Sequence, residues 1–399
     1  MKKPGTGVGS PIFIRREIGE HSVRPEVSDR FPWECIHLPV HHSVHLKGLN
    51  GLRGIAALAV VVMHTSIGLQ PFGLPWNRLL NELGIFAVTI FFGLSGFLIT
   101  YLLLLEKDDR GQVSVKHFYI RRILRIWPLY FLYLSICVIV IWATKTQQLP
   151  GSLPYYLFLT ANIPYIRAHT LHLLGHYWSL GVEEQFYLFW PWVARKEKLE
   201  KILGVFIVLF FGLKLSARAY WAYSGHNTPY TALDVTRFDC MAIGGMGAMW
   251  FHRHSTIFWR ICTSIPAQII AWGGLVALAF NRFHILPIID NEIVSVLTVV
   301  LIVNVSSNPR TLVNLEWSLP NYLGKISYGI YVIHPLIIFG IQRWCGAWIS
   351  QLALVLRYGL VYGAVAALTI GLAASSYEFY EKRFLYLKER FSTVKSLSG

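Results

Sequence analysis

Charged side chains are scarce in this chain. Asp, Glu, Lys and Arg make up 14% of its 399 residues, whereas soluble domains carry about 25%. Hydrophobic residues reach 54% and gather in runs of roughly twenty residues, the length that a helix needs to cross a bilayer. The composition excludes an ordinary soluble protein and predicts an all-α polytopic membrane protein.

Cysteine is scarce as well, and the cysteines show neither disulfide nor metal-ligand spacing. We interpret them as small apolar side chains. They are Cys35, Cys137, Cys240, Cys262 and Cys345.

A long apolar run is missing from residues 1–47, which contain five prolines. We expect a polar, mostly disordered cytoplasmic tail there and no cleaved signal peptide. Pro39 interrupts any helix that would align the histidines of this tail, so no metal site is predicted. These histidines are His37, His41, His42 and His45.

About ten apolar segments are long enough to be transmembrane helices. Their approximate limits are residues 51–69, 83–105, 126–144, 177–194, 202–221, 233–251, 261–280, 292–306, 322–340 and 352–376. Residues 153–166 are also apolar, but this stretch is short and proline-rich, so we expect a re-entrant or interfacial segment buried in protein. The predicted membrane domain covers residues 48–380, and residues 381–399 form a basic cytoplasmic tail.

The positive charge of the chain is unevenly distributed. The net charge is +15, and Lys and Arg gather in every second connection between the predicted spans. The positive-inside rule then predicts a multi-pass protein of the cell (inner) membrane with both termini cytoplasmic. The excess charge is expected to meet the lipid bilayer and an anionic cofactor, and no nucleic acid partner is expected.

The first span carries Arg53 near its start and His64 eleven residues later. Eleven helical residues rise roughly 16 Å, so His64 reaches the middle of the membrane or beyond if Arg53 lies at one surface. An ionisable side chain at that depth is a candidate functional residue. A histidine satisfied by a neighbouring helix is the alternative.

Arg122 and Arg125 are three residues apart at the start of the third span, so a helix presents both guanidinium groups on one side. Such a pair suits bidentate contacts with phosphate. Topology-setting charge that meets lipid headgroups is the alternative. In the second span, the small residues within Phe91-Phe92-Gly93-Leu94-Ser95-Gly96-Phe97 favour a notch for close helix packing over a nucleophile elbow.

Two adjacent carboxylates lie about two turns inside the fourth span, at Glu183 and Glu184. Successive helical residues point about 100° apart, so we do not expect the two to share one environment. An ion pair of Glu183 with Arg237 is an alternative to a catalytic role. Arg237 lies in the sixth span together with Asp239.

Ser327, Tyr331 and His334 recur in the ninth span at i, i+4 and i+7, on one helical face. A polar stripe among apolar neighbours is expected to line a cavity rather than face lipid.

In this order, the motifs resemble the acyltransferase-3 family of integral-membrane acyltransferases. The resemblance covers residues 49–385. It rests on Leu49 to His64 with its Arg-(ten residues)-His spacing, Phe91 to Phe97, Arg122-x-x-Arg125 with Pro128, Trp178-Ser179-Leu180 through Glu183, and Ser327-Tyr328 to His334-Pro335. The chain departs from the family at Asn50, where Asp is usual, and at Arg383, where Pro is common.

The resemblance implies a membrane O-acyltransferase. It would move an acyl group, often acetyl, from cytoplasmic acyl-CoA to a hydroxyl of a carbohydrate-containing acceptor such as a surface or exopolysaccharide. It implies that His64 is the catalytic base and that Glu183 is essential, with no permanently bound cofactor or metal ion. We expect the donor at Arg53, Arg122 and Arg125. We expect substrate or oxyanion support from Trp178, Ser179, Arg237, Asp239, Ser327, Tyr331 and His334.

In the expected mechanism, neutral His64 takes the proton of the acceptor hydroxyl as its oxygen attacks the thioester. Glu183 sets the tautomer of His64 or holds the acceptor, and Tyr331 or His334 donates to the oxyanion. An acyl-enzyme route stays open. The rival hypotheses are a proton-coupled transporter or flippase of a glycan or lipid-linked intermediate, and another class of membrane O-acyltransferase with an intramembrane histidine.

Overall fold

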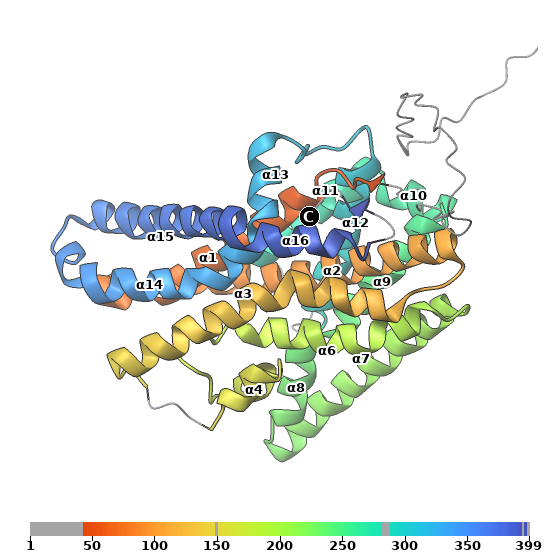
Figure 1. Cartoon of the computed structure of the whole chain (residues 1–399). Coiled ribbons are helices and arrows are strands. Elements are labelled where there is room, and N and C mark those ends of the chain that lie inside the picture. Colours follow the sequence, from red (N-terminus) through yellow and green to blue (C-terminus); the bar gives the residue numbers. More distant parts are fainter. Residues whose placement is uncertain (1–42, 148–150, 281–287, 393–394, 397–399) are drawn as a thin grey trace, which may run out of the picture.

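The computed structural model describes residues 43–147, 151–280, 288–392 and 395–396, and helices dominate them (Figure 1). The elements are β1 Ser43–Val44, α1 Leu49–Ile67, η1 Gln70–Phe72, η2 Arg78–Leu80, α2 Asn81–Arg110, α3 Val115–Thr144, α4 Leu153–Leu157, α5 Asn162–Ile166, α6 Tyr177–Ala194, α7 Leu199–Ser224, α8 Thr228–Thr236, α9 Phe238–His252, α10 Thr256–Cys262, α11 Ile265–Ala279, α12 Asp290–Ser307, α13 Ser318–Lys325, α14 Ser327–Ile349, α15 Leu354–Ser376, η3 Tyr377–Glu381, α16 Lys382–Glu389 and β2 Lys395–Ser396. The two short strands pair in parallel.

Seven helices among the described residues are long and apolar enough to cross a membrane, and α10 with α11, bent by 59°, makes an eighth if that pair is one span. The seven are α1, α2, α3, α7, α12, α14 and the helix Leu354–Glu389. The all-α polytopic membrane class is therefore confirmed. A helix stands at each of the ten expected spans, but α6 and α9 are outside this set, so ten crossings stay a prediction.

Contacts at the loops that connect the helices show which helix ends lie together. At one end, here called the basic end, Lys107 Nζ donates to Arg195 O (3.2 Å) and Arg253 pairs with Glu200 (2.6 Å). The connections that follow α2, α6 and α9 therefore share one end of the bundle, as the alternation of Lys and Arg predicts. At the opposite end, the Gln342 side chain donates to the carbonyl of Gly68 after α1 (2.7 Å).

Two expected helices are interrupted. Arg237 adopts a left-handed conformation (φ 43°) between α8 and α9, so the prediction of one continuous helix over residues 233–251 is wrong. The span expected over residues 322–340 is likewise divided at Ile326, where α13 ends and α14 begins.

The apolar stretch at 153–166 forms α4 and α5, each five residues long and too short to cross a membrane. Asn162 and Gln185 exchange side-chain hydrogen bonds that fix α5 to α6. Gly181 allows this approach, since a Cβ there would meet Ala161 N at 3.0 Å. The prediction of a non-spanning segment packed on protein is confirmed.

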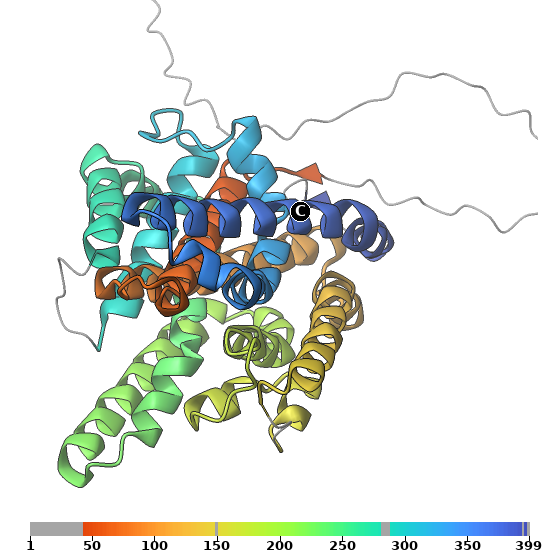
Figure 2. The ribbon, with the colours of Figure 1, turned by 90° about the vertical axis from the view of Figure 1, so that its left-hand side faces the viewer.

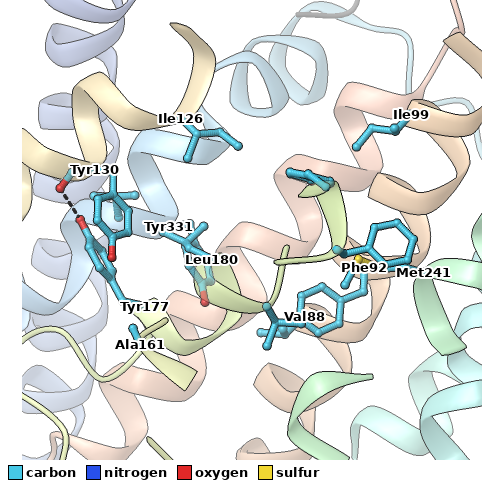
Figure 3. Close-up of a cluster of buried hydrophobic side chains, with 14 of the residues drawn as sticks. Val88, Phe92, Ile99, Ile126, Tyr130, Ala161, Tyr177, Leu180, Met241 and Tyr331 are labelled. Atoms are coloured by element: carbon cyan, nitrogen blue, oxygen red, sulfur yellow. Dashed lines mark hydrogen bonds between the residues drawn. The ribbon is translucent and has the colours of Figure 1, made fainter. Parts of the chain in front are cut away.

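An aromatic core holds α6 against α3. Tyr130 and Tyr177 stack with ring centroids 4.3 Å apart, and the Tyr177 hydroxyl donates to Tyr130 O (2.9 Å; Figure 3). Leu180 and Phe92 extend the buried cluster toward α2. This packing sets the rotation of α6, and hence the direction in which its polar residues point.

The C-terminal helices run back along the bundle. The α16 helix lies beside α3, whereas α7 and α8 lie at the far margin (Figures 1 and 2). Arg121 Nη1 donates to Phe391 O (2.9 Å) and the Tyr380 hydroxyl to Pro128 O (3.2 Å). Part of the expected tail at residues 381–399 is thus a helix packed on the membrane domain.

The start of the described chain is tied to the α12–α13 connection and to α13. His45 Nε2 bonds Glu316 Oε1 (2.5 Å), and Asn50 Nδ2 donates to Asn321 Oδ1 (2.6 Å). Asn50, the departure noted above, therefore anchors the first turn of α1. Most of the expected tail at residues 1–47, with Cys35, His37, His41 and His42, falls outside the described residues.

The packing notch expected around residues 91–97 brings α2 and α9 into backbone contact. A Cβ on Gly96 would lie 1.9 Å from Met241 O, and one on Gly244 would lie 2.2 Å from Gly93 O. The close approach is therefore possible only with glycine, and the packing interpretation is confirmed.

We expect Gly96→Ala to destabilise the protein by about 1–3 kcal/mol, because the two helices must separate to admit the methyl group. Thermal unfolding of the purified protein in detergent measures this effect. Gly212→Ala on α7 is the matched control, because nothing lies within 4 Å of a Cβ there. Equal melting temperatures for both variants would contradict the contact between α2 and α9.

Candidate active site

A narrow cavity passes between α1, α2, α3, α6 and α14. It has two adjoining halves of about 60 Å³ each. The residues that line both halves are Arg53, Ser95, Leu180, Glu183 and Tyr328. A cavity of this volume is too small for a nucleotide.

Three guanidinium groups converge on one half of the cavity, from Arg53 on α1 and from Arg122 and Arg125 on α3. Arg53 lines both halves of the cavity. Within the described part of the chain, none of the three is in an ion pair. Arg121, by contrast, pairs with the buried Glu106 at 2.7 Å.

Cationic side chains that are not in ion pairs among the described residues gather around this half of the cavity. Lys388 of α16 adds a fourth cation within electrostatic range of Arg53, Arg122 and Arg125. Glu183, Glu184 and Glu381 are the carboxylates in range of the arginines, and Glu389 is in range of Lys388. We refer to Arg53, Arg122, Arg125 and Lys388 as the cationic cluster. Sequence reasoning missed Lys388, since nothing in the pattern of the tail indicates that α16 folds back over α3.

Glu183 lies in the cavity rather than beside His64. Its Oε1 accepts from Ser95 Oγ (2.8 Å) and its Oε2 from the Tyr187 hydroxyl (3.2 Å). The hypothesis that Glu183 sets the tautomer of His64 is therefore wrong. Tyr187 was not singled out, although its i+4 spacing from Glu183 is a usable signal. Glu184 instead accepts from Trp127 Nε1 (3.0 Å), so the adjacent carboxylates occupy different environments, as expected.

Hydroxyl groups line the other half of the cavity. Ser179 Oγ and the Tyr331 hydroxyl are hydrogen-bonded (2.5 Å), and Tyr331 also donates to His176 O (2.9 Å). Ser327 lines the same half and donates to Gly324 O (2.8 Å). The polar face predicted for α14 is therefore buried in protein.

Three histidines form a cluster beyond Tyr331. The ring centroids of His64 and His334 are 4.9 Å apart, and those of His176 and His334 are 5.3 Å apart. His64 is half-buried, whereas His334 is fully buried. Sequence reasoning did not single out His176, because it lies just before the start of α6 and only tertiary packing brings it to the other two.

Hydrogen bonds to backbone carbonyls assign the tautomers of these rings, because a carbonyl can only accept. His64 Nδ1 bonds Val60 O (3.1 Å), His334 Nδ1 bonds Ile330 O (3.3 Å) and His176 Nε2 bonds Val332 O (3.2 Å). The remaining ring nitrogen of each neutral imidazole is then an acceptor. His334 in this form cannot donate to an oxyanion through Nε2. Tyr331 is left as the expected donor, and its hydroxyl must turn away from His176 O to serve.

The histidine cluster adjoins the cavity without lining it. Tyr331 lines the cavity, and its ring centroid is 6.1 Å from that of His334 and 5.4 Å from that of His176. His64 is therefore separated from the cationic cluster by the Ser179–Tyr331 pair.

Trp178, Arg237 and Asp239 do not line this cavity. Arg237 Nη1 donates to Thr89 Oγ1 (2.8 Å), and its guanidinium group is 3.8 Å from Asp234 and not in an ion pair with Glu183. The alternative of a structural Glu183–Arg237 pair is therefore wrong. Asp239 is 1% exposed on α9, away from the residues that line the cavity.

Residues 46–377 match the family model described as an acyltransferase domain. The chain belongs to the acyltransferase-3 family. It is 28% identical over 326 residues to the peptidoglycan O-acetyltransferase OatA of Listeria monocytogenes, with 74% of this chain and 49% of that protein covered.

Two further relatives come from Staphylococcus aureus. The O-acetyltransferase OatA of strain NCTC 8325 is 27% identical over 325 residues, with 74% of this chain and 51% of that protein covered. A provisionally named O-acetyltransferase of strain COL is 26% identical over 373 residues, with 85% of this chain and 57% of that protein covered. The chain thus spans about half the length of these relatives. No solved structure matches it.

For this acyltransferase domain, we expect opposite effects on stability from neighbouring arginines. Arg121→Gln leaves Glu106 without its partner and should lower stability by about 3–5 kcal/mol. Arg125→Gln removes one of several like charges around a cavity and should raise the melting temperature. Thermal unfolding in detergent at low ionic strength compares the two. A loss of stability in both variants would contradict net repulsion between Arg125 and the neighbouring arginines.

Proposed function

We propose that this chain is a membrane O-acetyltransferase that moves an acetyl group from cytoplasmic acyl-CoA to a hydroxyl of a carbohydrate-containing acceptor. The observation that carries the proposal is one narrow cavity with the cationic cluster at one half and hydroxyl groups, backed by three histidines, at the other. The relatives, two O-acetyltransferases of which one is a peptidoglycan O-acetyltransferase, support acetyl as the group and a glycan such as peptidoglycan as the acceptor.

The cationic cluster suits the phosphates of the donor. Buried guanidinium groups without paired anions favour a polyanionic ligand, and charge-assisted bonds to phosphate are strong. The nucleotide would stay at the cluster while the linear pantetheine arm enters the cavity and carries the thioester toward Ser179 and Tyr331. The basic end would then face the cytoplasm of an inner membrane, with both termini on that side.

His64 suits the role of general base. With Nδ1–H donating to Val60 O, Nε2 accepts the proton of the acceptor hydroxyl as its oxygen attacks the thioester carbonyl. The C–S bond breaks, and the CoA thiolate takes the proton back from the imidazolium. The Tyr331 hydroxyl, whose single proton is bonded to His176 O in this structure, would turn to donate a hydrogen bond to the developing oxyanion, and His334 supports the orientation of His64.

We expect His64→Ala and His64→Gln to lower acetyl transfer by about 100-fold or more, the range of a lost general base. Membranes supplied with labelled acetyl-CoA and a glycan acceptor, with product mass as the readout, measure transfer. His226→Ala is the control, because this histidine is exposed and lies in the α7–α8 connection.

Full transfer by either His64 variant would remove His64 as the base. An acceptor that crosses the membrane with unchanged mass in the wild type would favour the flippase hypothesis.

We expect Arg122→Ala and Arg125→Ala to raise the KM for acetyl-CoA about tenfold or more, because each removes a charge-assisted bond to phosphate. The KM of the acceptor should not change. Lys116→Ala, an exposed charge on the same helix, is the control. With acetyl-pantetheine as the donor, which lacks the nucleotide, the wild type and both variants should transfer acetyl at the same rate. A defect with this truncated donor would contradict phosphate binding.

A further inference from the structure

An aromatic box surrounds Trp178 outside the cavity. The Tyr165 ring of α5 stacks on Trp178 with centroids 5.2 Å apart and an interplanar angle of 24°. Phe92 meets Trp178 edge-on at 6.0 Å, and the Arg237 guanidinium carbon lies 5.6 Å from the centre of the Trp178 ring. Trp and Tyr side chains also anchor proteins at membrane interfaces, but that role does not require a second stacked ring and a guanidinium group beside the tryptophan.

The residues of this box are held rigidly. Arg237 keeps its left-handed backbone because Nε donates to Asp234 O (2.7 Å), and Nη1 to Thr89 Oγ1 (2.8 Å). A positive φ in a residue with a long side chain is strained and persists where surrounding contacts determine it, which is typical of ligand sites. Tyr165 is fixed through the reciprocal Asn162–Gln185 hydrogen bonds.

The box combines an exposed ring with accessible polar groups. Tyr165 is 41% exposed, and the Asp234 side chain, next to Arg237, is 29% exposed. An aromatic platform with a carboxylate and a guanidinium group at its edge matches a sugar ring, whose C–H face is apolar and whose rim carries hydroxyl groups.

The box also adjoins the cavity. Phe92 contacts Trp178 and lines the cavity. Ser179, the residue after Trp178, also lines the cavity. Tyr165 lies within electrostatic range of Tyr331. A ring stacked on the platform would therefore extend toward the hydroxyl-lined half of the cavity rather than toward the cationic cluster.

We propose that Tyr165 and Trp178, with Arg237 and Asp234 at their edge, form the binding platform for a pyranose ring of the acceptor. This inference rests on the proposed function and places the acceptor on the side of the cavity away from the donor phosphates. Residues 153–166, which carry Tyr165, are then a substrate-binding segment.

The experiment measures binding directly, so that it does not depend on transfer. Purified full-length protein in nanodiscs is titrated with fluorescently labelled chitotetraose and, in parallel, with a labelled acyclic polyol. We expect the wild type to prefer the sugar. Tyr165→Ala should weaken sugar binding about tenfold, because the stacked face is lost. Tyr165→Phe should bind like the wild type.

Phe158→Ala is the matched control, because this aromatic ring is 78% exposed on the same segment. Equal sugar binding by Tyr165→Ala and Phe158→Ala, or no sugar preference in the wild type, would overturn the platform. Acetyl transfer from acetyl-CoA to chitotetraose is measured separately. Sugar binding that depends on Tyr165, without any acetylated product, would instead overturn the proposed function.

Discussion

Positive charge that the described part of the chain does not hold in ion pairs, inside an apolar bundle, is the constraint on which the site depends. Charged groups in a membrane domain are costly unless they are paired or face a polar cavity. Arg121 meets this requirement with Glu106, whereas Arg122, the next residue, and Arg125, about one helical turn further on, open onto the cavity. The fold therefore separates a structural arginine from two that are available to an anion.

The cavity separates the cationic cluster from the histidines that would accept and return the proton. Glu183 is bound to Ser95 and Tyr187 on the side of the cationic cluster, and the histidines lie behind Tyr331. In the proposed reaction, this separation keeps the phosphates away from the base and leaves only a narrow passage for the thioester. A neutral imidazole cluster in surroundings of low polarity then serves as a proton acceptor.

Irregular backbone is confined to places where protein covers it. The segment with α4 and α5 packs on α3 and α6, through the Tyr130 hydroxyl (2.8 Å to Tyr156 O) and the Asn162–Gln185 pair. The break at Arg237 is closed by side-chain bonds to α2. Such interruptions are tolerated at membrane depth only when other groups satisfy their polar atoms, and here both meet at Trp178.

The sequence by itself determined the membrane class, the approximate position of most helices and the placement of Arg122 and Arg125 on one side of a helix, because apolar run length and helical spacing are local properties. The family followed from the order of the motifs. Only the tertiary structure decided that His176 joins His64 and His334, that Lys388 returns to the arginines, and that Glu183 bonds Ser95 instead of His64. These contacts join residues far apart in the chain, and helix rotation and packing, which no local pattern encodes, set which side chains meet.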